Sequence, residues 1–270
     1  MNLPRNAFLE QLQSGKTLWG CWLGLPDPNV AEIAANAGFD WLLIDHEHAP
    51  FELSDVMAHL RAMAPYPVAP IVRPVNGDPA LLKKFLEMGV QTFIVPMVDT
   101  PEQAQACVDA VYYPPEGRRG VGTALARASH WNQVPDYLHH ANEEICLIVQ
   151  AETVTAIENL DAILALDKVH GVFIGPSDLA ASMGKIGQGN DPELIARCIK
   201  AIRKIKAAGK IAGILTAHEE LIQQSADAGA NFIGIGVDTL LLGEALRQRA
   251  ASRPSFFLPS HVVVTPHKKL

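Results

Sequence analysis

The sequence predicts a single (β/α)8 barrel (a TIM barrel) with a long loop between its fourth and fifth strands and a C-terminal tail. Short apolar runs rich in Val, Ile, Leu and Trp alternate with longer segments of helical periodicity along almost the whole chain. This alternation is typical of parallel strands joined by helical crossovers. Eight such units fit into about 250 residues, the usual size of this barrel. An open doubly wound sheet is the alternative, but no glycine-rich dinucleotide fingerprint follows the first strand.

The predicted strands are short and mostly apolar. They are Gly20–Leu25, Trp41–Asp45, Val68–Arg73, Thr92–Val98, Ile145–Ala151, Gly171–Gly175, Ile211–Thr216 and Phe232–Gly236. We expect the barrel to span residues 1–250. The tail, residues 251–270, is expected either to pack on a neighbouring subunit or to be disordered.

Two of the predicted helices carry clear end signals. Asn29 precedes a helix that Gly38 ends, and an Asp-Pro pair at 78–79 opens a helix that Gly89 ends. Asp or Asn at the N-cap, Pro in the first turn and Gly after the last turn satisfy the free backbone groups of a helix.

The segment Tyr112–Asn142 is too long for a simple crossover. We expect it to be a functional loop that follows the fourth strand, with a subunit-interface element as the alternative. Its arginines Arg118, Arg119 and Arg127 could accordingly bind a distal carboxylate of a substrate or hold an interface.

Composition excludes several classes of partner. The 270 residues include 22 Lys+Arg and 29 Asp+Glu, a net charge of −7, which argues against a nucleic-acid partner. No apolar run approaches the ~20 residues of a membrane span, and the N-terminus lacks the pattern of a signal peptide, so we expect a cytoplasmic protein. The four scattered cysteines are expected to be buried, reduced thiols.

Polar residues follow four of the predicted strands, where a barrel of this kind carries its chemistry. The fifth strand runs into Gln150 and Glu152, and the sixth runs into Gly175 and then Asp178. Two carboxylates with water suit Mg²⁺ or Mn²⁺, and the Gly-Pro-Ser turn at 175–177 can hold an anion. In the alternative interpretation, Glu152 caps the next helix and Asp178 opens a loop.

The second and third predicted strands supply an acid/base group and a cation. The second ends in Asp-His-Glu-His at 45–48, where Asp45 could orient His48 as a general base, although His46 competes for that role. Arg73 ends the third strand and could bind a carboxylate or a developing oxyanion, or else form a salt bridge that closes the barrel end.

Lysine placement argues against imine chemistry, which needs a desolvated lysine near the reacting carbon. Five lysines lie on predicted helix surfaces: Lys83, Lys84, Lys200, Lys204 and Lys206. Lys168 and Lys210 precede strands, and Lys185 lies in a rim loop. The glycines around Lys185 are expected to leave it solvated. Metal-assisted enolate chemistry is therefore favoured.

Several ordered motifs between about Phe8 and Ala250 resemble the HpcH/HpaI family of metal-dependent pyruvate aldolases, in particular the 4-hydroxy-2-oxoheptanedioate aldolases. The matching segments are GFDWLLID at 38–45, EHAP at 47–50, VRP at 72–74, RGVG at 119–122, LARA at 125–128, VQ at 149–150, ET at 152–153, GVFIGPSDL at 171–179 and GVDT at 236–239. His46 departs from the glycine usual in the family.

The resemblance implies a barrel, usually a hexamer of swapped dimers, that reversibly cleaves a 4-hydroxy-2-oxo acid such as 4-hydroxy-2-oxoheptanedioate into pyruvate and an aldehyde such as succinic semialdehyde. It implies a divalent ion (Mg²⁺, Mn²⁺ or Co²⁺) on Glu152 and Asp178, with His48 as the acid/base assisted by Asp45. Arg73 would stabilise the enolate. The residues implied to line the substrate site are Gln150, Gly175, Pro176, Ser177, Leu215 and Val121.

Two other functions stay open. An aldolase for 2-keto-3-deoxy sugar acids shares nearly all of these motifs, and the residues quoted do not separate the two substrates. A non-catalytic barrel that binds an oxo acid is the other possibility, although binding alone does not need a base such as His48.

Overall fold

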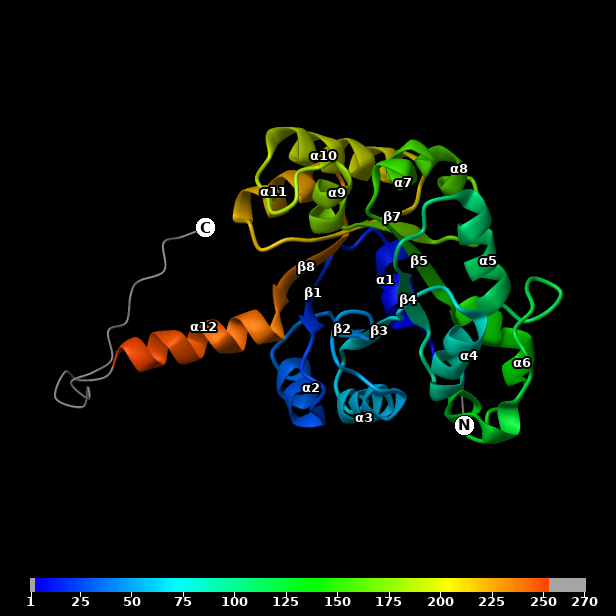
Figure 1. The fold of residues 1–270 in the computed structure, drawn as a ribbon. Coiled ribbons are helices and arrows are strands. Elements are labelled where there is room, and N and C mark those ends of the chain that lie inside the picture. Colours follow the sequence, from blue (N-terminus) through cyan, green and yellow to red (C-terminus); the bar gives the residue numbers. More distant parts are fainter. Residues whose placement is uncertain (1–2, 253–270) are drawn as a thin grey trace.

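A closed barrel of eight parallel strands, in the order β1 to β8, forms the centre of the computed structural model, which describes residues 3–252 (Figure 1). The strands are β1 Leu18–Leu23, β2 Trp41–Asp45, β3 Ala69–Arg73, β4 Thr92–Val95, β5 Cys146–Ala151, β6 Gly171–Ile174, β7 Ile211–Leu215 and β8 Phe232–Val237. The predicted (β/α)8 fold is confirmed.

Helices surround the barrel (Figure 1). The α-helices are α1 Ala7–Gln13, α2 Pro28–Ala35, α3 Leu53–Met63, α4 Pro79–Met88, α5 Pro101–Val111, α6 Tyr137–His140, α7 Val154–Glu158, α8 Leu160–Leu164, α9 Pro176–Ser182, α10 Pro192–Ala207, α11 Glu219–Asp227 and α12 Asp238–Ala251. Three short 3-10 helices, η1 Thr123–Leu125, η2 Arg127–Ser129 and η3 Ala141–Glu144, lie between α5 and β5.

The core has two layers because side chains alternate along each strand. In β2, Leu42 and Ile44 face the helices, whereas Trp41 and Leu43 join an inner cluster that fills the barrel. Gly20 leaves room for this filling, since a Cβ there would come within 2.0 Å of the Trp41 indole. Side chains of α1 belong to the inner cluster and close the barrel at the amino ends of its strands.

Strand β4 is three residues shorter than predicted. Pro96 cannot donate to the sheet, and Met97 adopts a left-handed conformation with φ of 54°. The chain therefore leaves the barrel after Val95. Strand β1 also differs, since it begins and ends two residues before the predicted Gly20–Leu25.

Helix ends follow the expected chemistry, with one correction. The N-cap of α2 is Asp27 rather than Asn29, because its carboxylate accepts the Asn29 backbone N–H and Pro28 takes the first helical position. For α4 the prediction is confirmed: Asp78 is the N-cap, and Gly89 ends the helix at φ of 99°.

The prediction of a rim loop at 112–142 is wrong. The crossover from β4 is the helix α5, so the segment follows that helix and leads into the amino end of β5, opposite the rim. It packs along α4, where Arg127 donates to the Met88 carbonyl at 2.9 Å and Arg119 reaches Glu87 at 3.3 Å. The alternative, that this segment forms part of a subunit interface, stays a prediction.

The last described helix, α12, stands out from the barrel (Figure 1). Its first residue, Asp238, is its one buried residue and accepts the backbone N–H groups of Gly24 and Leu25 at 2.8 and 3.1 Å. The expected tail, 251–270, lies outside the described residues from 253 onward. All four cysteines are buried and unpaired, as expected, and none of the helices in residues 3–252 is long and apolar enough to cross a membrane.

Candidate active site

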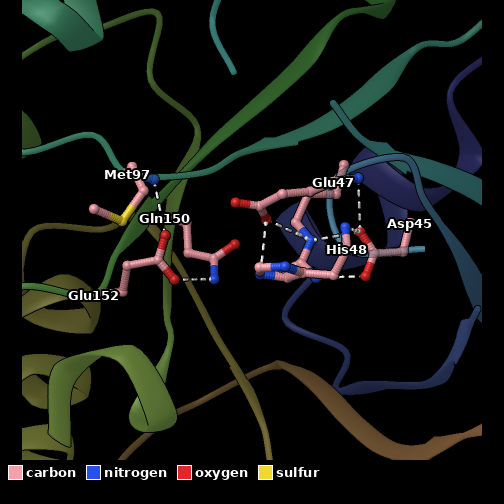
Figure 2. Close-up of polar contacts among 7 residues, drawn as sticks. Asp45, Glu47, His48, Met97, Gln150 and Glu152 are labelled. Atoms are coloured by element: carbon pink, nitrogen blue, oxygen red, sulfur yellow. Dashed lines mark hydrogen bonds and ion pairs between the residues drawn. The ribbon is translucent and has the colours of Figure 1, made fainter. Parts of the chain in front are cut away.

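The carboxyl ends of the strands surround a cleft of about 360 Å³. Most of the predicted site residues line this cleft. They are His48, Arg73, Gln150, Gly175, Pro176, Ser177, Asp178 and Leu215, joined by Trp22, Phe173 and Ile174. Figure 2 shows Gln150 and Glu152 on one side of the site and Asp45, Glu47 and His48 on the other.

Asp45 and Arg73 form a buried, two-point ion pair at the floor of the cleft. The β2–β3 register places the two residues directly opposite each other. Arg73 Nε donates to Asp45 Oδ1 at 3.0 Å and Nη2 donates to Oδ2 at 2.5 Å. Burial alone would lower the pKa of Arg73, but the hydrogen bond and charge of Asp45 outweigh it and raise that pKa. The cleft therefore contains a fixed cation, as the stabilisation of an oxyanion requires.

The structure separates the two histidines that the sequence could not. His48 lines the cleft and its side chain is 66% exposed. His46 packs edge-on against the Phe85 ring at 5.2 Å, outside the cleft, and burial lowers its pKa. The geometry thus favours His48 as the acid/base.

The expected Asp45–imidazole pair is not formed. Asp45 Oδ1 accepts the backbone N–H of Glu47 at 3.0 Å and of His48 at 3.3 Å, besides its bonds to Arg73. The carboxylate beside the His48 ring belongs to Glu47, whose Oε2 lies 3.7 Å from Nε2.

Glu152 is almost completely buried and held by its neighbours. Met97 donates its backbone N–H to Oε1 at 2.8 Å, and the Gln150 side-chain amide donates to Oε2. The left-handed turn at Met97 thus serves the site. Desolvation raises the pKa of Glu152 to about 7. The alternative of a helix cap is not supported, because Thr153 is the N-cap of α7.

The residues around Glu152 fit a divalent cation. Gln150 Oε1 is a buried acceptor with no hydrogen-bond partner, and Asp178 lies at the cleft in the first turn of α9. A Cβ on Gly175 would come within 2.6 Å of Glu152 Oε2, so glycine keeps this space open. No cluster of three acidic, His or Cys ligands occurs in residues 3–252, and Mg²⁺ commonly uses one or two carboxylates with water and substrate oxygens.

Lys185 is partly exposed and is also held by two carboxylates. Its ammonium group binds Asp191 at 2.7 Å and Glu193 at 2.8 Å. These hydrogen bonds raise its pKa, whereas a lysine that forms an imine must lose its proton. The finding strengthens the case against imine chemistry.

Sequence reasoning missed several residues and misplaced one. Glu47 was overlooked between the two histidines, although it follows the same strand end as they do. Trp22 and Phe173 line the cleft, and the signal for them was an aromatic residue inside a predicted strand. Val121, expected at the aldehyde pocket, is 65% exposed and lies outside the cleft of its own chain.

Comparison with known proteins identifies the family of this chain. The model of the HpcH/HpaI aldolase/citrate lyase family matches residues 18–245. A hydroxypyruvate/pyruvate aldolase of Pseudomonas aeruginosa is 54% identical over 93% of each chain. A 4-hydroxy-2-oxo-heptane-1,7-dioate aldolase of Salmonella paratyphi B is 50% identical over 92% of this chain and 94% of its own.

Solved structures show the same likeness. A HpcH/HpaI aldolase/citrate lyase family protein from Burkholderia cenocepacia J2315 superposes with a TM-score of 0.87 at 34% identity, covering 91% of this chain and 98% of its own. The names of these relatives support a lyase and are consistent with retro-aldol cleavage to pyruvate. The chain belongs to the HpcH/HpaI aldolase/citrate lyase family.

Proposed function

We propose that this protein reversibly cleaves a 4-hydroxy-2-oxo acid, such as 4-hydroxy-2-oxoheptanedioate, into pyruvate and an aldehyde such as succinic semialdehyde. The observation that carries the proposal is the buried Arg73 guanidinium, held by Asp45 at two points. It lies at the cleft with His48 and the carboxylates of Glu152 and Asp178. Binding alone would not require a base and a fixed cation together.

The residues of the chain divide the chemistry between them. His48 removes the proton of the C4 hydroxyl, the C3–C4 bond breaks, and its electron pair passes into the enolate of pyruvate. Arg73, held by Asp45, stabilises the negative enolate oxygen. The Gly-Pro-Ser turn at 175–177 and Gln150 line the site for the oxo acid. A divalent ion (Mg²⁺, Mn²⁺ or Co²⁺) held by Glu152 and Asp178 would supply Lewis acidity there.

Loss of the methyl proton signal of pyruvate in D₂O tests this proposal without choosing an aldehyde. With Mg²⁺, Mn²⁺ or Co²⁺ present, we expect the wild-type protein to exchange the methyl protons, and we expect a chelator to stop the exchange. A protein that leaves pyruvate unchanged with every ion would instead be an oxo-acid-binding barrel. Because relatives are named hydroxypyruvate/pyruvate aldolase, hydroxypyruvate belongs in the same assay.

The substrate class needs a separate comparison. Equal amounts of 4-hydroxy-2-oxoheptanedioate and a 2-keto-3-deoxy sugar acid should be cleaved at different rates, with the dicarboxylic acid faster under our proposal. The apolar residues Leu215, Trp22 and Phe173 in the cleft lining support a substrate with an aliphatic chain over a polyol.

We also propose that the protein is a homo-oligomer, in line with the hexamer implied by the family resemblance. In support, α12 exposes four leucines, Leu240, Leu241, Leu242 and Leu246. Several large exposed apolar side chains on one projecting helix are typical of an interface. We propose further that Val121, which is exposed and outside the cleft of its own chain, lies at the cleft of a neighbouring copy.

A further inference from the structure

We propose that Glu47 is a positioning residue that orients the His48 imidazole, the task expected of Asp45. This inference rests on the proposed function, in which His48 carries the proton of the C4 hydroxyl. Four observations support it: the partners of Asp45, the contacts of Glu47, the exposure of His48 and the charges around Glu47.

The hydrogen bonds of Asp45 go to groups other than the His48 ring. Its two oxygens accept Nε and Nη2 of Arg73. Oδ1 also accepts the backbone N–H groups of Glu47 and His48. These bonds direct the Asp45 carboxylate toward Arg73 and the turn after β2, so Asp45 shapes the backbone at His48 and leaves the ring to another group.

Glu47 lies beside both Arg73 and His48. Its Oε2 lies 3.1 Å from Arg73 Nε and 3.7 Å from His48 Nε2. Figure 2 shows Glu47 beside His48. The Glu47 side chain is only 14% exposed, and its buried Oε2 has no hydrogen bond. A buried carboxylate oxygen needs donors, and the two groups beside it are the Arg73 guanidinium and the His48 imidazole, whose Nε2 donates when it carries a proton.

His48 needs such a partner because packing within its own chain does not fix it. Two thirds of its side chain is exposed, so its ring can rotate unless a polar contact restrains it. The Arg73 guanidinium is held in place by Asp45. Glu47 therefore links a fixed group, Arg73, to a free one, His48.

The charges around Glu47 are of both signs. Burial raises the pKa of Glu47; Arg73 and His48 oppose this rise, and nearby acids add to it. The charged and titratable groups that face Glu47 are Arg73, His48, Asp45, Asp178 and Glu152. Removing the charge of Glu47 takes an anion away from the imidazole, which then gives up its proton more readily.

The test is Glu47→Gln, assayed by retro-aldol cleavage of 4-hydroxy-2-oxoheptanedioate with Mg²⁺ across pH 5.5 to 8.5. We expect kcat to fall about 10- to 100-fold, as for a misplaced reacting group, with KM changed less than about threefold. The acidic limb of the pH–rate profile should move to lower pH by about half a unit. Glu219→Gln, the same change at the same rim, is the control and should alter neither.

A comparison with Asp45→Asn decides between the two carboxylates. If Asp45→Asn shifts the acidic limb and Glu47→Gln does not, Asp45 orients the ring and the inference is overturned. If the wild type cleaves the substrate and Glu47→Gln has the same kcat and pH–rate profile, this inference is overturned and the proposed function stands. Wild-type protein that neither cleaves the substrate nor exchanges pyruvate protons overturns the proposed function and this inference with it.

Discussion

The Asp45–Arg73 pair controls where charge lies in the cleft. It is buried and doubly hydrogen-bonded, and it also contacts Glu47. Adjacent strands place the two residues in register, so the orientation of the guanidinium depends on the sheet as well as on the side chain.

Arg73→Ala should lower turnover by about 10²–10³ if Arg73 stabilises the enolate oxygen. The affinity for Mg²⁺ should change little, because Arg73 is not among the expected ligands. Arg73→Lys keeps the charge but loses the two-point geometry, so it should recover only part of the rate. Steady-state kinetics with a Mg²⁺ titration measure both effects, and near-normal turnover in Arg73→Ala would refute the role.

The Glu152 carboxyl gives a pH-dependent prediction. The pKa of Glu152 is about 7 in the fold, above its unfolded value, so the folded chain binds this proton more tightly. Glu152 therefore makes folding less favourable as pH rises from about 4.5 through about 7. Glu152→Gln removes this effect and should raise the free energy of unfolding by about 2 kcal/mol at pH 8, and much less at pH 5.

Urea unfolding with a chelator present measures this difference. In the wild type, adding Mg²⁺ at pH 8 should raise the unfolding midpoint, since a ligand that binds the native state stabilises it. In Glu152→Gln that rise should be small. An equal gain at pH 5 and pH 8 would show that Glu152 does not titrate as the structure indicates.

Single residues also show where prediction from the sequence stops. Arg73, His48 and Glu152 were predicted because each follows a strand directly and must lie at the rim. The partner of the His48 ring could not be predicted in this way. Asp45, Glu47 and His48 share one turn, and which of the two carboxylates faces the imidazole depends on side-chain contacts with β3.

Among the elements, the turn between β6 and α9 packs directly against the site. Gly175 lies against Glu152 and Gln150, and a Cβ there would come within 2.9 Å of the Glu152 Cβ and 3.0 Å of the Gln150 Nε2. A glycine at this turn therefore lets the backbone at 175 lie close to the buried Glu152 carboxylate.

Gly175→Ala should displace the Glu152 and Gln150 side chains. We expect a loss of about 1–3 kcal/mol in stability, typical of an overpacked site, with cleavage lowered at least tenfold. The matched control is Gly189→Ala, because nothing lies within 4 Å of a Cβ at that glycine. Urea unfolding and the cleavage assay measure the two effects. Equal results for the two variants would show that the close approach at Gly175 has no consequence.

The segment 112–142 shows how an element can be identified and still be misplaced. Its length and composition marked it as unusual, but whether it preceded or followed a helix depended on finding α5. Pro101 begins α5 directly after β4 and its short turn, which makes that helix the crossover. The long segment then has to enter β5 from the amino end.

For the whole molecule, α12 is the feature that the single chain leaves unexplained. Its leucines are exposed, whereas most other helices bury an apolar face against the barrel. The double variant Leu242→Glu with Leu246→Glu changes two residues one turn apart on the same face. If α12 is an interface, the variant should have the mass of a monomer, 29.2 kDa, and an unchanged circular dichroism spectrum.

Size-exclusion chromatography with light scattering measures this mass. The control is Ile186→Glu, which places the same charge on an exposed apolar residue away from α12 and should leave the wild-type oligomer intact. A wild-type protein that elutes as a monomer would contradict the proposed assembly.

The sequence by itself determined the barrel and the residues at its rim. Strand and helix periodicity are local, and the carboxyl ends of parallel strands meet at one rim whatever the details of packing. Only the tertiary structure decided the partners: Asp45 with Arg73, Glu47 with His48, and Met97 with Glu152. These contacts join residues from different strands or from one crowded turn, and their geometry follows from register, burial and backbone conformation, which sequence spacing does not contain.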